Sequence, residues 1–257
     1  MEAPRLVGTG SWPPSALGNE MHNNVSDDQT VSSDRAAGIL GVAAALFREK
    51  GYAATTTREI AARLGIKNAS LYHHFGSKED ILYRICIDSL VRVESAVREA
   101  IEVEGPAEVQ VKRLIAAHVV TMLADHDLNS TMLLELRSLS PGRRADVVAL
   151  RDRYELVVRG VIAEAQQRGY ARGDIPPQYI SMVLFGALNW LMVWYREDGE
   201  LSADGLAKLI ATLFEEGISP REERGALAAH PQSLPSDRES AAAASTAPAR
   251  FSAEVDE

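Results

Sequence analysis

The stretch that decides the fold is IKNASLYHHFGSKEDIL, residues 66–82. Ser77 followed three residues later by Asp80 is typical of a helix start, because the serine oxygen accepts backbone N–H groups and the acid complements the helix dipole. The segment 68–74 before it contains no helix breaker and predicts a short helix. His73 and His74 would point about 100° apart on that helix, so a shared metal ion is not expected.

Two further helices are predicted upstream of this stretch. Thr56 and Glu59 have the spacing of a capping box, which predicts a short helix over 57–64 closed by Gly65. A longer helix ends at Gly51 and carries one apolar stripe, formed by Ile39, Val42, Ala43, Leu46 and Phe47. The two short helices have apolar faces of their own, made of Ile60, Ala61 and Leu64 and of Ile66, Leu71 and Phe75. Three helices in this order predict a helix-turn-helix, whose second short helix enters the DNA major groove.

The outward face of the 68–74 helix has side chains that suit DNA. Asparagine pairs with adenine, serine with several base edges, and an alanine methyl packs on the thymine methyl. Tyrosine and lysine suit phosphates, which fix the register of the protein on the duplex. Residues 34–84 contain eight Lys or Arg and five Asp or Glu, a net charge of +3, whereas the whole chain has −9. A basic segment on an acidic body is expected of a specific DNA-binding protein.

The rest of the chain predicts an all-α protein with two low-complexity ends. It has 257 residues, of which 46% are hydrophobic, enough for a sizeable core. We predict a disordered extension over 1–33, the helix-turn-helix domain over 34–80, a helical body over 81–218 and a disordered tail over 219–257. The expected body helices span about 78–102, 107–126, 129–139, 144–168, 177–196 and 202–214.

Composition and motifs disfavour several other classes of protein. The N-terminal residues lack the apolar run of a signal peptide, and the apolar run 180–195 is shorter than the roughly 20 residues that span a bilayer. The single cysteine, Cys86, fits a reducing compartment, so a cytoplasmic protein is expected. No G-x-S-x-G, phosphate loop or HExxH pattern is present, and His118 and His126 would lie about 12 Å apart along one helix. We therefore predict no catalytic residue, no metal site and no cofactor. The cluster Arg151, Asp152 and Arg153 is expected at the surface or at the edge of a pocket.

The predicted helix-turn-helix segment resembles a known family. The segment 43–79 is similar to the N-terminal domain of TetR-family transcriptional regulators, without a gap. The matching residues are Ala43, Leu46, Phe47, Gly51, Tyr52, Thr55, Thr56, Ile60, Ala61, Leu64, Gly65, Ile66, Leu71, Tyr72, His74, Phe75, Ser77, Lys78 and Glu79. The later helices match the family in layout.

The resemblance implies a homodimeric, ligand-responsive repressor of a palindromic DNA operator. Its DNA-facing residues would be Thr57, Arg58, Lys67, Asn68, Ala69, Ser70, Tyr72, His73 and Lys78. The family usually has a small hydroxyl residue where this chain has Lys67; either Asn68 caps the recognition helix instead, or Lys67 contacts DNA. The alternative is a helical interaction protein that keeps the helix-turn-helix fold without binding DNA.

The body is expected to bind a ligand and to dimerise through the 177–196 and 202–214 helices as a four-helix bundle. Candidate pocket residues are His118, Met122, Met132, Leu136, Arg137, Tyr154, Phe185, Asn189 and Trp190. Many apolar and few polar side chains predict an apolar ligand with a polar handle. The segment WYREDGELS, 194–202, is similar to a stretch in TetR-family regulators of lipid and steroid catabolism, some of which sense acyl-CoA thioesters. An acyl-CoA effector is therefore one hypothesis, and an aromatic drug or other small hydrophobic molecule is its main rival.

Overall fold

The computed structural model describes the backbone of residues 25–219 and the side chains of residues 34–219. Over these residues the chain forms α-helices and one short 3-10 helix, and the described part contains no strand. The predicted all-α class is therefore confirmed. The range 1–24 of the predicted extension and the range 220–257 of the predicted tail lie outside the described residues.

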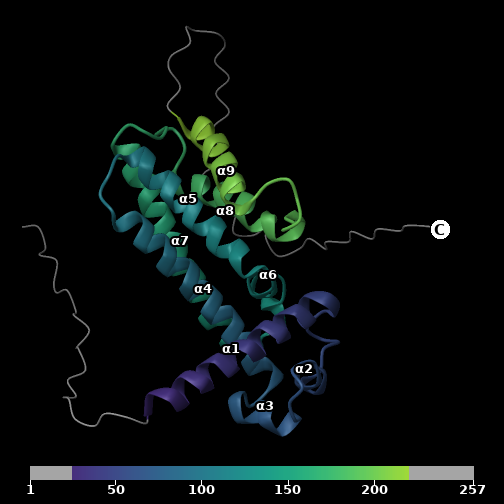
Figure 1. Ribbon diagram of the computed structural model, residues 1–257. Coiled ribbons are helices and arrows are strands. Elements are labelled where there is room, and N and C mark those ends of the chain that lie inside the picture. Colours follow the sequence, from purple (N-terminus) through teal and green to yellow (C-terminus); the bar gives the residue numbers. More distant parts are fainter. Residues whose placement is uncertain (1–24, 220–257) are drawn as a thin grey trace, which may run out of the picture. The chain divides into compact units, whose positions relative to one another are not determined.

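The first three helices form the headpiece, seen at the lower end of Figure 1: α1 Val25–Lys50, α2 Thr57–Arg63 and α3 Asn68–His74. Their apolar faces meet in one core, in which Ile39, Phe47, Ile60 and Leu71 are fully buried. Burying four such side chains stabilises the headpiece by roughly 1.5–3 kcal/mol each before the entropy cost is counted. The predicted helix-turn-helix is thus present in the structure.

The predicted ends of the headpiece helices are confirmed in detail. The Thr56 hydroxyl accepts the Glu59 N–H while the Glu59 carboxylate accepts the Thr56 N–H, which completes the capping box. The Lys50 ammonium and the Thr56 N–H lower the pKa of Glu59 to about 2. Gly51 and Gly65 have φ angles of 84° and 67°, in the left-handed region where glycine ends a helix without steric cost.

The remaining helices form the body: α4 Lys78–Glu102, α5 Ala107–Ala124, α6 His126–Leu134, the 3-10 helix η1 Leu136–Ser138, α7 Pro141–Gln167, α8 Pro177–Trp194 and α9 Ala203–Ile218. Figure 1 shows α4 running from the headpiece into the body, where it packs against α5, α6 and α7. The predicted serine caps are present, since Ser77 accepts the Asp80 N–H and Ser202 accepts the Gly205 N–H. Helix α4 thus connects the two parts physically.

Several predicted boundaries differ from those in the structure. Helix α1 begins at Val25, inside the range predicted to be disordered. Asp125 ends α5, so His126 begins a separate helix. Helix α7 begins earlier than predicted, at Pro141, because proline is tolerated in the first turn. Helix α9 continues past Phe214 to Ile218, whose side chain is buried in the body.

Among the helices of the described range, none combines the length and the apolar character needed to cross a membrane.

Candidate functional site

Six of the nine residues predicted to contact DNA lie on or beside the outer face of α3. Leu71, on its inner side, is buried in the headpiece core. On the outer face, four side chains are exposed: Lys67, Ala69, Tyr72 and His73. Two are half-buried: Asn68 and Ser70. The headpiece core therefore holds α3 by one side and leaves the other side to a partner outside the chain.

One hydrogen bond ties this face to α2. The Tyr72 hydroxyl lies 3.2 Å from the Thr57 hydroxyl, and Tyr72 is 47% exposed. Thr57 and Arg58 open α2, so the start of that helix and the outer face of α3 form one continuous polar surface. Two hydroxyls at one point, held by two helices, can position a phosphate group.

The start of α3 decides between the two alternatives for Lys67. Lys67 is the N-cap residue and its side chain makes no capping hydrogen bond, and Asn68 is the first helical residue. The alternative in which Asn68 caps the helix is therefore wrong. The Asn68 carboxamide oxygen is buried without a hydrogen-bond partner among the described residues. Lys67 remains exposed and directed to the outside, as contact with DNA requires.

The cations of the headpiece divide into paired and unpaired groups. Arg63 is paired with Glu49 at 2.9 Å, and Lys50 is paired with Glu59. Arg58 and Lys67, by contrast, form no ion pair with a described residue. These two side chains can therefore pair with DNA phosphates. Such pairing would release counterions from the DNA, which favours binding of the protein.

Lys78 does not lie where the sequence predicts. Its ammonium donates to the carbonyl oxygens of Tyr52 and Thr55, each at 2.7 Å, and lies 4.2 Å from the centre of the Tyr52 ring. Burial lowers the pKa of this ammonium. The predicted phosphate contact is therefore corrected: Lys78 fastens the loop between α1 and α2 to the start of α4.

Lys78→Met is expected to lower the free energy of unfolding by about 1–3 kcal/mol, since two part-buried carbonyls lose a charged donor. The slope of log affinity for DNA against log salt should stay at the wild-type value. Loss of a phosphate contact would instead reduce that slope by about one. Urea unfolding and fluorescence anisotropy at several salt concentrations measure the two quantities. Arg58→Met is the control: it should reduce the salt slope and leave the free energy of unfolding unchanged. A reduced slope with unchanged stability in Lys78→Met would contradict the assignment.

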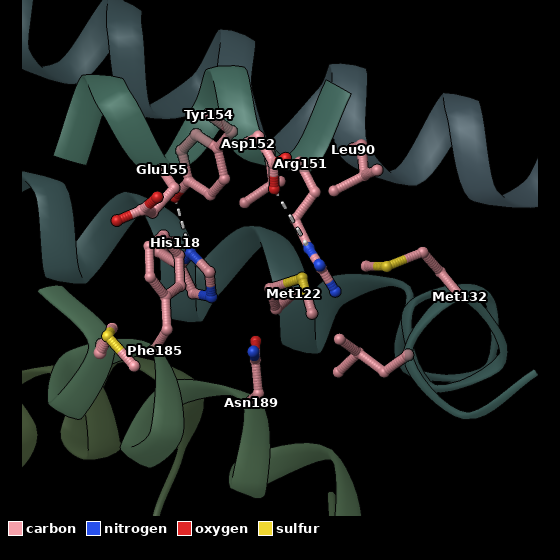
Figure 2. Close-up of a pocket in the computed structure, with 13 residues that line it drawn as sticks. Leu90, His118, Met122, Met132, Arg151, Asp152, Tyr154, Glu155, Phe185 and Asn189 are labelled. Atoms are coloured by element: carbon pink, nitrogen blue, oxygen red, sulfur yellow. Dashed lines mark hydrogen bonds and ion pairs between the residues drawn. The ribbon is translucent and has the colours of Figure 1, made fainter. Parts of the chain in front are cut away.

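A cavity of about 320 Å³ lies in the body and is lined by side chains of α4, α5, α6, α7 and α8 (Figure 2). Six of the predicted pocket residues line it: His118, Met122, Met132, Tyr154, Phe185 and Asn189. The wall also contains residues that the sequence did not predict: Leu90, Val93, Leu133, Glu155 and Met182. Most of these lie on α4 and α7, whose inward faces carry no motif that marks them. Arg151 and Asp152 do lie at the pocket edge, whereas Arg153 pairs with Glu94 at 3.1 Å.

The deepest polar group in the cavity is a pair of side chains from α5 and α7. His118 Nδ1 and the Tyr154 hydroxyl lie 2.7 Å apart, and both residues are buried. The ring of Phe185 meets both rings edge-on, with centroids 5.9 Å and 5.5 Å away. Burial lowers the pKa of His118 to about 4 and raises the pKa of Tyr154. Both groups are therefore uncharged at neutral pH and act only through hydrogen bonds.

Three predicted pocket residues lie elsewhere. Arg137 is exposed in η1, Leu136 is half-buried beside it, and neither lines the cavity. Trp190 is 62% exposed on α8. It follows Asn189 by one residue, a turn of about 100° around the helix, so one side chain enters the cavity and the next points away. The pocket role predicted for Trp190 is therefore wrong.

The segment 194–202 lines a different hollow. Tyr195, Arg196, Glu197 and Asp198 line a wider groove of about 990 Å³, together with residues of α1, α5 and α6 such as His126. Arg196 and Asp198 form an ion pair at 3.0 Å within this segment. The similarity to lipid and steroid regulators thus falls beside α6 rather than on the wall of the cavity.

Helix α6 and its surroundings join the cavity to the headpiece. Met132 lines the cavity, and its neighbour Thr131 donates a hydrogen bond of 3.3 Å to the Ala44 carbonyl of α1. Glu135, just after α6, accepts the Tyr52 N–H at 3.1 Å. Arg48 of α1 pairs with Asp127 of α6. These contacts connect the wall of the cavity with α1 and with the loop that Lys78 fastens.

A second link runs from α4 to α7. Glu79 accepts the Ser140 N–H at 2.8 Å, and Asp80 forms an ion pair with Arg143. The Arg143 guanidinium also lies 5.3 Å from the centre of the Tyr83 ring. The start of α4, directly after α3, is thus held by the start of α7.

One surface of the body is apolar and uncovered. We call it the α8–α9 face; its exposed side chains are Met182, Val183, Trp190, Val193, Trp194, Leu209 and Leu213. Large apolar side chains exposed on two helices in this number are a common feature of interaction surfaces.

These features define a class: a helix-turn-helix DNA-binding protein with a ligand cavity in a helical body. Comparison with known proteins identifies the family. Residues 39–85 match the profile "Bacterial regulatory proteins, tetR family", and residues 104–218 match "Tetracyclin repressor-like, C-terminal domain". The chain belongs to the TetR family of transcriptional regulators.

Individual relatives agree over most of their length. The HTH-type transcriptional repressor KstR2 of Rhodococcus jostii is 29% identical over 196 residues, which cover 76% of this chain and 96% of the relative. The crystal structure of the TetR-family regulator PfmR from Thermus thermophilus is 36% identical, covers 69% of this chain and 97% of its own, and has a TM-score of 0.65. The crystal structure of AibR with isovaleryl coenzyme A and operator DNA is 23% identical, with coverage of 70% and 97% and a TM-score of 0.61, and shows a shared fold.

Proposed function

We propose that this chain is a homodimeric cytoplasmic repressor that binds a palindromic operator through the outer face of α3 and leaves it when an acyl-CoA-type effector enters the cavity. The observation that carries the proposal is α6, since one helix both lines the cavity with Met132 and bonds the headpiece through Thr131. The relative KstR2 is named a transcriptional repressor, which supports the direction of regulation.

The homodimer is proposed from the α8–α9 face. Two antiparallel helices with exposed apolar side chains can pair with the same helices of a second copy as a four-helix bundle. Such a contact is isologous and closes into a dimer with two-fold symmetry. Two recognition helices related by this axis would read the two halves of a palindrome about one turn of DNA apart.

The class of effector is proposed from the wall of the cavity and from one structural neighbour. Aliphatic and aromatic side chains make up most of the wall, as an acyl chain requires. Arg151 lies at the edge of the cavity, and its nearest acid, Asp152, is 3.9 Å away, so its guanidinium can bind an anionic group. AibR, which shares the fold, is described in complex with isovaleryl coenzyme A and operator DNA.

The proposed mechanism is a shift between two arrangements of the dimer. A ligand that presses on Met132 and Leu133 displaces α6, and the bonds from Thr131 and Glu135 carry the displacement to α1 and Tyr52. The headpieces then move apart or together, and the arrangement that fits both half-sites loses population. A ligand achieves this only through a difference in affinity between the two arrangements.

Fluorescence anisotropy of the full chain tests this function. The DNA would be the duplex upstream of its own gene, at physiological salt, with a scrambled duplex of the same length as the control. We expect specific binding that one chain-length class of acyl-CoA reverses and that free coenzyme A does not.

Two results would contradict the proposal in different ways. Binding no tighter than to the scrambled duplex would favour the alternative of a helical interaction protein. Specific binding that no acyl-CoA weakens would keep the regulator and exclude this effector class in favour of another small hydrophobic molecule.

A further inference from the structure

The cavity contains a buried nitrogen that the fold itself leaves unpaired. His118 is 2% exposed, and its Nε2 has no hydrogen-bond partner among the described residues. In Figure 2 the Nδ1 edge of the ring faces Tyr154, and the Nε2 edge points the other way, toward Met122 and Asn189. A buried polar atom without a hydrogen-bond partner raises the free energy of the folded state. A partner from outside the chain would remove that cost.

The bond to Tyr154 determines what kind of partner that is. If Nδ1 carried the ring proton and donated to Tyr154, the tyrosine O–H would have no acceptor among the described residues, and Nε2 would be a second unpaired group. If Tyr154 donates to Nδ1, the hydroxyl and Nδ1 are both satisfied and only Nε2–H remains. The second arrangement leaves fewer buried groups unpaired and therefore has the lower free energy. His118 then presents a donor to the cavity.

Two neighbours restrict the charge of the partner. Asn189 also lines the cavity, and its carboxamide makes no hydrogen bond with a described residue, so it offers a second donor (Figure 2). Glu155 is in the same wall, bonded to Arg159 at 2.5 Å and to Ser181 at 3.2 Å. Its carboxylate disfavours a second anion in the deep part of the cavity, and an uncharged imidazole cannot offset one. Among the described residues that line the cavity, Arg151 at the edge is the cation that can match an anion.

We propose that His118 Nε2–H, with the Asn189 carboxamide as second donor, binds an uncharged carbonyl oxygen of the effector, as in an acyl thioester. The inference rests on the proposed function and names the group that the deep part of the cavity recognises. Met122 lies beside His118 and has an adaptable side chain, which can move aside to admit the carbonyl. Any anionic part of the same ligand would lie toward Arg151.

The test compares two small probes that differ at one atom position. S-octanoyl-N-acetylcysteamine is a thioester, and S-octyl-N-acetylcysteamine has a methylene in place of the carbonyl. Calorimetric titration of the full-length protein should show the thioester binding about three- to tenfold more tightly, the value of one net hydrogen bond. In His118→Phe most of this preference should be lost, and in Asn189→Leu a smaller part of it.

Met122→Leu is the matched control. It changes the same part of the wall without changing a donor, so both affinities should shift together and the ratio should persist. Equal affinity of the two probes in the wild type, no binding of either probe, or a ratio that survives in His118→Phe would overturn the inference. Operator binding by the same preparations is measured without a probe. Intact operator binding would mean that only the inference about His118 has failed, and loss of specific operator binding would mean that the proposed function has failed.

The wild-type chain provides a readout that requires no variant. Long-range proton–nitrogen correlation spectra of the chain with labelled histidine identify the ring nitrogen that carries the proton. We expect the proton on Nε2 of His118, and a change in that resonance with the thioester that the thioether does not produce. A proton on Nδ1 would overturn the inference, because Nε2 would then be an acceptor.

Discussion

Leu213→Glu is expected to leave the chain folded but monomeric, and to weaken operator binding by about 100-fold or more. Leu213 is 61% exposed on the α8–α9 face, so the substitution removes little from the core of one chain. In the proposed two-fold dimer, however, each copy would place its glutamate in the same apolar contact, where burying the charges is costly. A monomer binds one half-site and loses the gain from binding two half-sites together.

The matched control is Leu156→Glu on α7. Leu156 is 60% exposed but does not belong to the α8–α9 face, so the variant should remain dimeric and bind the operator as the wild type does. Sedimentation analysis measures the oligomeric state, and anisotropy measures operator affinity. Trp190→Ala should weaken the dimer in the same direction. A dimeric Leu213→Glu with intact operator binding would show that the dimer forms through another surface.

Tyr72→Ala is expected to weaken operator binding by about 30-fold without a change in stability. The dimer would lose the contact twice, and two contacts of about 1 kcal/mol each give this factor. The Tyr72 side chain is half exposed and its hydroxyl bonds only the Thr57 hydroxyl within the described chain, so the fold depends little on it. Anisotropy with operator and scrambled duplexes, together with thermal unfolding, measures both effects.

Two further variants locate the effect. Arg63→Ala removes an exposed headpiece cation that is already paired with Glu49, and operator affinity should stay near the wild-type value. Tyr72→Phe keeps the ring and removes the hydroxyl, so it should reproduce most of the loss if the hydroxyl holds a phosphate. Operator affinity unchanged in Tyr72→Ala would mean that the outer face of α3 is not the DNA-binding surface.

The headpiece could be predicted from sequence because its determinants are local. A capping box needs Thr56 and Glu59 three residues apart, and a left-handed helix end needs glycine at Gly51 and Gly65. Side chains at helical spacing on one stripe must face the core. Each of these rules involves residues within one or two turns of each other, so the type and order of the helices follow from the sequence alone.

The cavity was predicted less completely because helical spacing is a weak guide to the inner surface of a bundle. Large apolar residues on α5, α6 and α8 marked part of the wall, including Met122, Met132 and Phe185. The contribution of α4 was missed, since Leu90 and Val93 have the same pattern as ordinary core residues. Whether an apolar side chain fills a core or lines a cavity depends on what stands opposite, and that depends on how the helices pack.

The sequence by itself determined the helical class, the helix-turn-helix and the family. The tertiary structure decided the roles of particular side chains. Lys78 faces the carbonyls of Tyr52 and Thr55, more than twenty residues earlier, and His118 meets Tyr154 across two helices. The physical reason is range: caps and turns are set by hydrogen bonds between near neighbours, whereas a long side chain finds its partner only after distant segments have packed.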